Sequence, residues 1–179
     1  MLTMESTGTA TIAHFARLFP MVRGWVEGTV ATLTPEQATW QPAGLALPAG
    51  AQYAHILTSE DFLLHGAARG GAPLAMSTWQ GRTGISELPP AGAWDDWARW
   101  VVVDLPAARA YGQAVYAATD AYLASATDDD LAREVDLSAI GVGFKTVAEI
   151  LDLLLVNAAA HCGEISCLKG LQGAQGYPF

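Results

Sequence analysis

Three polar residues interrupt an otherwise apolar helix face near the C-terminal end of the sequence, within residues 146–170. At about 100° per residue, Asn157, His161 and Glu164 fall on one stripe. The apolar members of the same stripe are Ile150, Leu153, Leu154 and Leu168. A buried polar group without a partner costs about 1–3 kcal/mol, so a face with three of them is expected to bind something. Asn157 and His161 are four residues apart, so their side chains lie one above the other and can converge on one ion or ligand.

A second inward-facing histidine is expected on an earlier helix, over residues 50–69. In this helix His55 shares its side with Ile56, Ser59, Phe62 and Leu63. The charged or titratable residues Glu60, Asp61 and His65 are predicted to point away from that side.

His55, Asn157 and His161 are therefore the candidate metal ligands. A neutral imidazole is the commonest protein ligand for zinc, nickel and related ions, and catalytic sites keep open positions for water or substrate. The same pattern also fits histidines that are hydrogen-bonded in a core, with Asn157 or Glu164 as the partner. Two histidines alone do not decide between these interpretations.

Helices are the elements that must position these residues. Residues 9–33 have apolar side chains at helical spacing, which are Ile12, Phe15, Phe19, Val22, Val26 and Val30. Thr34 before Pro35 predicts a short helical turn, and Thr127 before three aspartates predicts another. His14 lies beside the apolar stripe and is predicted to face solvent.

The last helix has start and stop signals of its own. Thr146 followed by Glu149 predicts its beginning, and Gly170 predicts its end. A further helix is expected over residues 93–126, where Pro106 should kink or break it.

A long connection separates the second and third long helices. Residues 70–93 contain five glycines and three prolines without a periodic pattern. A segment of this length can cross the bundle and bring the next helix in parallel to the previous one. Trp79 in its middle is expected to pack onto the bundle or to cover an opening. We therefore predict an all-α four-helix bundle with long crossover connections, as a single domain over residues 1–179.

Composition excludes several kinds of partner. Hydrophobic residues make up 51% of the chain and charged residues 15%, with a net charge of −9. This charge repels phosphate backbones and anionic lipid, so neither nucleic acid nor a membrane surface is an expected partner. The uninterrupted apolar runs are shorter than the roughly 20 residues that cross a bilayer. Because the N-terminus has no basic start and no apolar run, we predict a cytoplasmic, untargeted protein.

Cys162 and Cys167 point to opposite sides of one helix and are not expected to form a disulfide.

Three segments resemble the DinB/YfiT-like superfamily of metalloenzymes. They are LTPEQATWQPAG, AHILTSEDFLL and TVAEILDLLLVNAAAHCGEISCLKGLQG. The resemblance implies a four-helix bundle with long crossover connections, often as a homodimer. It also implies a divalent metal held by a histidine on the second helix and an HxxxH pair on the last; the mycothiol-dependent maleylpyruvate isomerase branch has ExxxH instead. His55 and His161 match the family's positions, whereas Asn157 stands where the family has His or Glu.

The carboxamide at position 157 leaves two functions open. A neutral amide oxygen binds a divalent ion more weakly than an imidazole or a carboxylate. Glu164 either replaces it as a ligand or hydrogen-bonds near the site. The first function is an enzyme for small molecules that uses zinc, nickel or iron, either a thiol-dependent transferase or isomerase or a hydrolase. The second is a metal-free helical bundle that binds a ligand or forms a dimer.

Overall fold

The structure is a computed structural model that describes residues 8–179. Residues 1–7, on which the prediction of an untargeted protein partly depends, lie outside the described residues. The helical elements are α1 (Gly8–Val30), α2 (Pro35–Thr39), α3 (Ala49–Glu60), the π-helix η1 (Asp61–Ala68), η2 (Leu74–Met76), α4 (Asp95–Ala98), α5 (Leu105–Ser125), α6 (Asp128–Ala132), η3 (Ser138–Ile140) and α7 (Val147–Leu171). Two short strands, β1 (Glu134–Asp136) and β2 (Phe144–Thr146), form an antiparallel hairpin.

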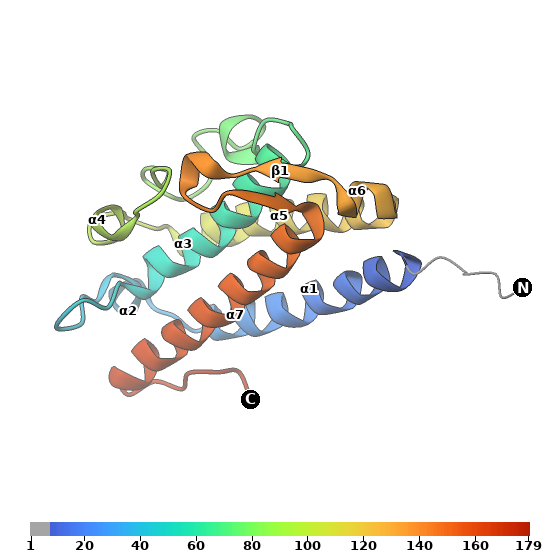
Figure 1. The fold of residues 1–179 in the computed structure, drawn as a ribbon. Helices are drawn as coiled ribbons and strands as arrows, with labels where there is room; N and C mark the ends of the chain where they lie inside the picture. The colour runs from blue at the N-terminus through green and yellow to red at the C-terminus, as the bar shows by residue number, and fades with distance from the viewer. Residues whose placement is uncertain (1–7) are drawn as a thin grey trace, which may run out of the picture.

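Four long elements form the bundle, which are α1, α3 with its continuation η1, α5 and α7 (Figure 1). α7 packs mainly along α1 and α3. In the α3–α5 pair, Leu57 lies against Gly112, and His65 further along meets Thr119. Later residues of one element thus meet later residues of the other, so α3 and α5 run parallel. The all-α bundle with a long crossover connection is confirmed.

The predicted helix starts are present as hydrogen-bonded caps. Thr34, Thr127 and Thr146 are the N-cap residues of α2, α6 and α7, and each takes part in a reciprocal capping box. Such a cap contributes about 1 kcal/mol. The cap of α7 matters most for function, because it fixes where the helix that carries His161 begins.

The break expected at Pro106 within residues 93–126 is confirmed. These residues form α4 and α5, and Pro106 lies in the first turn of α5, after the N-cap Asp104. Two other local features differ from the prediction. The last helix continues through Gly170 to Leu171, and Gly173 takes the left-handed conformation instead, at φ 76°. The β1–β2 hairpin was not predicted, because strands of three residues are too short to show an alternating pattern.

The apolar stripe of α1 is part of the core, as its spacing predicts. Phe15, Phe19, Val22, Val26 and Val30 are all buried. His14 beside the stripe is exposed, which confirms its predicted position.

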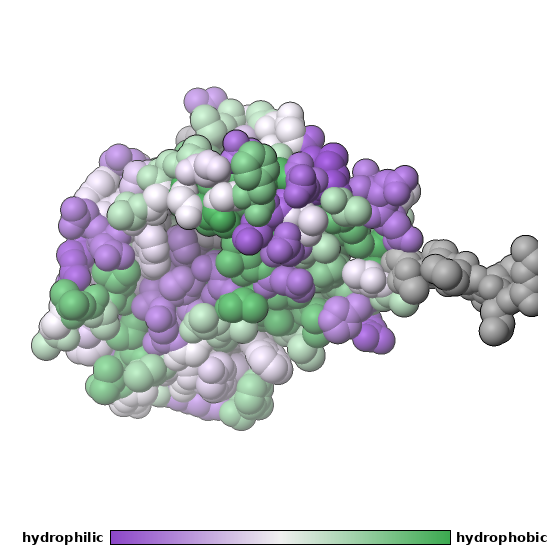
Figure 2. All heavy atoms as spheres, in the orientation of Figure 1, coloured by the Kyte–Doolittle hydropathy of each residue, from purple (hydrophilic) through white to green (hydrophobic). Residues whose placement is uncertain are grey.

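α7 is long and apolar enough to cross a membrane, the one helix in residues 8–179 of which this is true. The core helix of a soluble protein has the same properties. Here α7 packs along α1 and α3, and hydrophilic and hydrophobic residues are interspersed over the face of the molecule seen in Figure 2. The length of α7 is therefore explained by its place in the bundle.

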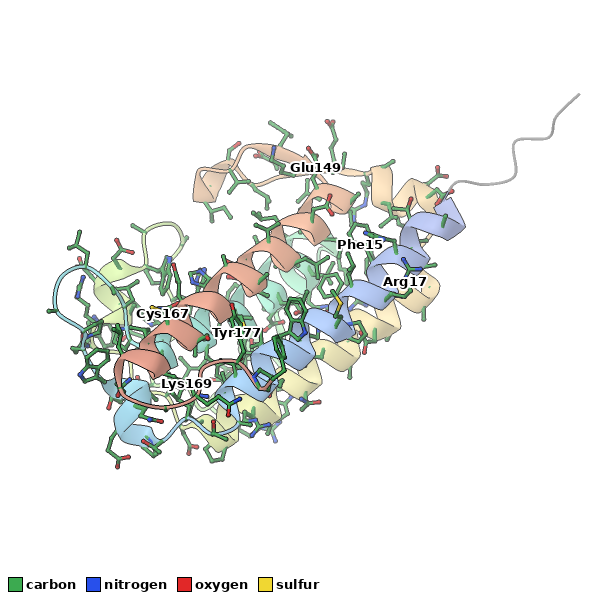
Figure 3. The ribbon with its side chains drawn as sticks, turned by 90° about the horizontal axis from the view of Figure 1, so that it is seen from below. Phe15, Arg17, Glu149, Cys167, Lys169 and Tyr177 are labelled. Atoms are coloured by element: carbon green, nitrogen blue, oxygen red, sulfur yellow. The ribbon has the colours of Figure 1, made fainter. Side chains whose placement is uncertain are left out.

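A buried lysine ties the C-terminal segment to the bundle. The Lys169 Nζ donates to the Thr29 carbonyl oxygen at 2.6 Å, to the Thr32 hydroxyl at 2.9 Å and to the Gly176 carbonyl oxygen at 3.3 Å. Burial lowers the pKa of Lys169. Figure 3 shows the segment with Tyr177 folded back along the helices.

Candidate metal centre

The imidazoles of His55 and His161 meet between α3 and α7. Their ring centroids are 5.0 Å apart and their planes are at 84°. Trp94, from the crossover segment, stacks on His55 with centroids 4.1 Å apart and planes at 4°. The same indole stands edge to face with His161, at 5.5 Å between centroids. One aromatic side chain therefore fixes the orientation of both imidazoles.

His161 is held through its Nδ1 atom. This nitrogen lies 2.7 Å from the Glu164 Oε2 and 3.2 Å from the Gln52 Oε1. Both partners are acceptors, so Nδ1 carries a proton, and in the neutral imidazole Nε2 keeps its lone pair for another ligand. Histidines that bind a metal commonly donate their other N–H to a carboxylate in this way.

His55 is neutral at physiological pH. Burial lowers its pKa to about 4, with a further lowering by the electrostatic effect of the His161 imidazole and a smaller opposing effect from a hydrogen bond with Asn157. The Ser59 hydroxyl lies 3.4 Å from His55 Nε2. A neutral imidazole has a free nitrogen lone pair, which is the form that binds metal ions.

Asn157 completes the group on α7, one turn before His161. Its side-chain Nδ2 is buried and has no hydrogen-bond partner. A donor left in this state is uncommon in folded proteins, and such a group calls for an explanation. The carboxamide thus has a hydrogen bond with His55, while its Nδ2 has no partner.

The spacing of the two imidazoles fits a shared ion. Two imidazoles that bind one ion through nitrogen at about 2.1 Å place their ring centroids roughly 5 Å apart. The observed 5.0 Å agrees with this value. The amide oxygen of Asn157, beside His55, could supply a third donor. Within the described part of the chain, no three His, Cys, Asp or Glu side chains form a potential metal group, so the donor set is neutral.

Glu164 lies outside this donor set. Its side chain is 58% exposed, and its carboxylate binds the Nδ1 side of His161. The structure therefore supports its interpretation as a hydrogen-bond partner near the site. A role as replacement ligand would require the carboxylate to leave His161.

A cavity of about 350 Å³ opens beside His55 and Asn157. It lies between α3 with η1, α7, the segment before β2 and the crossover connection. Its lining residues are His55, Thr58, Ser59, Phe62, Leu63, Pro89, Pro90, Ala91, Gly92, Trp94, Ile140, Val142, Leu153, Leu154 and Asn157. The site therefore combines two imidazoles and an amide with an apolar chamber.

Residues 20–165 match the family model of the DinB superfamily. The chain belongs to the DinB superfamily. A conserved protein from Enterococcus faecalis, known from a crystal structure, has the same fold, with a TM-score of 0.74 and 20% sequence identity over 89% of this chain and 95% of that chain. No curated protein matches the chain. At this identity the likeness to the bacterial structure extends to the fold alone.

For three residues of this DinB superfamily chain, the position predicted from the sequence was wrong. Glu60, Asp61 and His65 were predicted to point away from the core side of their helix, but all three are buried. One reason is that α3 changes to a π-helix at Asp61, which shifts the angular positions of the residues that follow. The other is that each side chain has polar partners on neighbouring elements.

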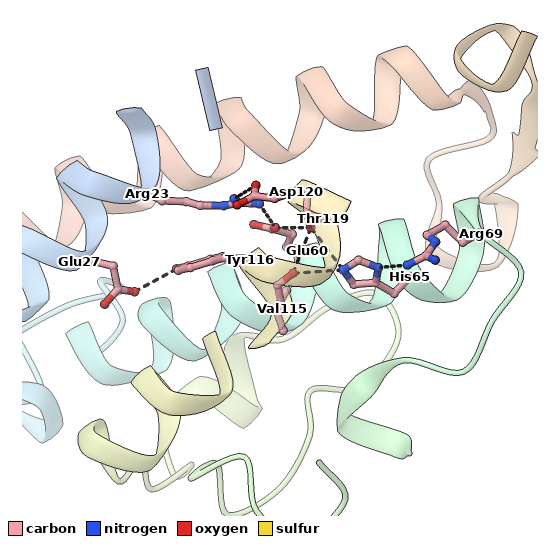
Figure 4. Close-up of polar contacts among 9 residues, drawn as sticks. All are labelled: Arg23, Glu27, Glu60, His65, Arg69, Val115, Tyr116, Thr119 and Asp120. Atoms are coloured by element: carbon pink, nitrogen blue, oxygen red, sulfur yellow. Dashed lines mark hydrogen bonds and ion pairs between the residues drawn. The ribbon is translucent and has the colours of Figure 1, made fainter. Parts of the chain in front are cut away.

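Glu60 and His65 belong to a buried polar network (Figure 4). Glu60 is paired with Arg23 of α1 at 2.5 Å and accepts a hydrogen bond from the Thr119 hydroxyl at 2.6 Å. Arg69 donates to His65 Nδ1 at 3.1 Å, so His65 Nε2 carries the proton and donates toward the Thr119 oxygen at 3.2 Å. Burial raises the pKa of Glu60, against the effect of Arg23, and burial lowers the pKa of His65.

Asp61 anchors the crossover connection. Its carboxylate accepts from the backbone N–H groups of Leu74 and Ala75, each at 2.8 Å, and from the Tyr111 hydroxyl at 2.7 Å. This anchor ties the start of the crossover segment to the bundle. One feature of the sequence could have predicted the burial of these acids. The apolar run Phe62–Leu64 follows them directly, and such a run indicates a helix that is covered on more than one side.

Proposed function

We propose that this DinB superfamily protein is a divalent-metal-dependent enzyme for small molecules, with His55, Asn157 and His161 as ligands. The observation that supports it best is the approach of the two imidazoles from separate helices, at 5.0 Å between centroids. A second supporting observation is the Glu164 carboxylate, which binds His161 Nδ1. That arrangement directs Nε2 toward a ligand.

Each residue has a separate task in this proposal. His55 and His161 supply neutral nitrogen donors, and Asn157 supplies an amide oxygen. Trp94 excludes water from one side of His55 by stacking on it. A zinc, nickel or iron ion in such a site lowers the pKa of a coordinated thiol or water and acts as a Lewis acid. The cavity beside the ligands is where the small-molecule substrate would lie.

The reaction class follows from this chemistry. We propose a thiol-dependent transferase or isomerase, or a hydrolase. The proposed setting is the cytoplasm, with a homodimer as the functional unit. The net charge of −9 favours neither nucleic acid nor an anionic membrane as a partner.

Metal analysis of protein purified without a histidine tag tests the proposal. We expect about one zinc, nickel or iron per chain and a higher melting temperature when the ion is added to metal-free protein. The variant His161→Gln should lose both effects, whereas His14→Gln, at an exposed position on α1, should keep them. Absence of stoichiometric metal together with no gain in melting temperature would contradict the proposal.

A metal-free binding or dimerisation module is the second candidate. It is favoured by the carboxamide at position 157 and by the lack, among residues 8–179, of three grouped ionisable ligands. The variant Asn157→His separates the two functions. Tight metal binding that appears only in the variant supports the module, and binding already present in the unaltered protein supports the enzyme.

A further inference from the structure

The cavity beside the proposed ligands has no charged lining. None of its lining residues is Asp, Glu, Lys or Arg. Phe62 and Leu63 from η1, Leu153 and Leu154 from α7, and Ile140 and Val142 from the segment before β2 form its apolar walls. In the metal-free protein a charged ligand would lose its hydration here without gaining a counter-ion, which is costly. The walls therefore select against anions and cations.

Among the polar side chains of the lining, the Asn157 amide has a buried donor without a partner. The Thr58 hydroxyl donates to the Ala54 carbonyl oxygen at 2.8 Å, and the Ser59 hydroxyl is next to His55 Nε2 at 3.4 Å. The Asn157 Nδ2 is buried without any partner. A ligand that supplies a hydrogen-bond acceptor would satisfy it.

We propose that the substrate class of this site is a neutral, mainly apolar small molecule with a carbonyl-type acceptor that binds the Asn157 Nδ2. The proposal rests on the proposed function, because it places the substrate beside the same ligands. It adds that the amide has two uses: its oxygen end serves the ion and its NH₂ end orients the substrate. The cavity volume of about 350 Å³ lies at the lower end of the range for ligand pockets.

Three probes of similar size test the proposal on metal-free protein. They are 4-phenyl-2-butanone, which has the acceptor; butylbenzene, which lacks it; and 4-phenylbutyrate, which is anionic. Binding is followed by NMR chemical-shift titration. We expect saturable binding of the ketone and binding of the carboxylate that is at least about tenfold weaker. No saturable binding of the ketone, or equal binding of the carboxylate, would overturn the proposal.

The variant Asn157→Leu tests the role of the amide. It removes the donor but keeps the size of the side chain, so the ketone should bind about tenfold more weakly while butylbenzene binds no more weakly. An equal change for both probes, or no change for the ketone, would overturn the role of Nδ2. Circular dichroism of the variant shows whether its helices are intact.

A matched pair of lysine variants tests the cavity without touching a proposed ligand. Leu153 lines the cavity and is 37% exposed, whereas Val156 on the same helix is 66% exposed and does not line it. Leu153→Lys should raise the affinity for 4-phenylbutyrate about tenfold, and Val156→Lys should not. An equal response in both variants would overturn the assignment of the binding site.

These results separate the substrate proposal from the metal proposal. If the protein binds the ketone but takes up no metal, the proposal of a metal-dependent enzyme is contradicted and the proposal of a neutral ligand in the cavity is supported. If the protein takes up metal but does not bind the ketone, the metal proposal is supported and the ligand proposal is contradicted.

Discussion

The imidazole of His55 stands edge to face with the imidazole of His161, with ring centroids 5.0 Å apart. The first residue comes from α3 and the second from α7, so two helices far apart in sequence bring their imidazoles into contact. Trp94 contacts both rings, and Glu164 binds the far side of His161. Two neighbours, Trp94 and Glu164, thus orient the pair.

Asn157→His should strengthen metal binding. The change replaces a weak neutral oxygen donor by an imidazole in the same turn of α7, so the affinity for Zn²⁺ should rise by at least about tenfold. Isothermal titration of tag-free protein measures it. Asn157→Leu is the control and should bind Zn²⁺ more weakly than the unaltered protein. Equal Zn²⁺ affinity of all three proteins would show that position 157 does not face the ion.

Glu164→Gln should weaken metal binding without removing a ligand. The Glu164 carboxylate fixes the proton of His161 on Nδ1, and loss of such a partner typically costs about 10–100-fold in metal affinity. The amide of the variant keeps the size of the side chain but removes the charge. Competition with a chelator of known affinity measures the change. A complete loss of binding would instead indicate that Glu164 is itself a ligand.

His55 should make the metal-free protein less stable in acid. Burial lowers its pKa to about 4 in the folded state, below the unfolded value of about 6.5. The unfolded chain therefore binds more protons in this window, and the free energy of unfolding falls as the pH falls from about 6.5 to 4. At pH 4 the loss due to this residue is on the order of 3 kcal/mol.

Urea unfolding at several pH values, compared with His55→Gln, isolates this contribution. The variant lacks the titrating group, so its free energy of unfolding should fall less steeply over the same range. Parallel curves for the two proteins would mean that His55 titrates normally in the folded state.

The Arg23–Glu60 pair should be strongly coupled. Both side chains are buried, and removal of one leaves the other without its partner, at a cost of about 3–5 kcal/mol. Arg23→Met should therefore destabilise the protein by about this amount, and Arg23→Met with Glu60→Gln by less than the sum of the single changes. A double-mutant cycle by urea unfolding measures the coupling. Simple additivity would contradict a direct interaction.

The helices and their starts could be predicted because they depend on local rules. The capping pairs at Thr34, Thr127 and Thr146 and the apolar spacing of α1 need no knowledge of distant contacts. The inward positions of His55 and Asn157 followed from the same 3.6-residue period, and both line the cavity. The resemblance of three segments to a family added the bundle topology, which the match over residues 20–165 confirms.

The buried acids could not be predicted because their burial depends on distant partners. Glu60 is stable inside only because Arg23 of α1 and Thr119 of α5 reach it. Asp61 is satisfied by backbone N–H groups of the crossover connection, which has no periodic pattern. His65 lies beyond the change to a π-helix, where a period of 3.6 residues no longer gives the correct face.

The central claim is that His55 and His161 bind the same ion. The most direct measurement is a Zn²⁺ titration of tag-free protein labelled with ¹⁵N-histidine, followed by NMR of the ring nitrogens. We predict that one nitrogen of His55 and the Nε2 of His161 shift together and saturate at one Zn²⁺ per chain, while His14 and His65 do not change. Shifts of only one of the two imidazoles, or no saturable shift of either, would contradict the claim.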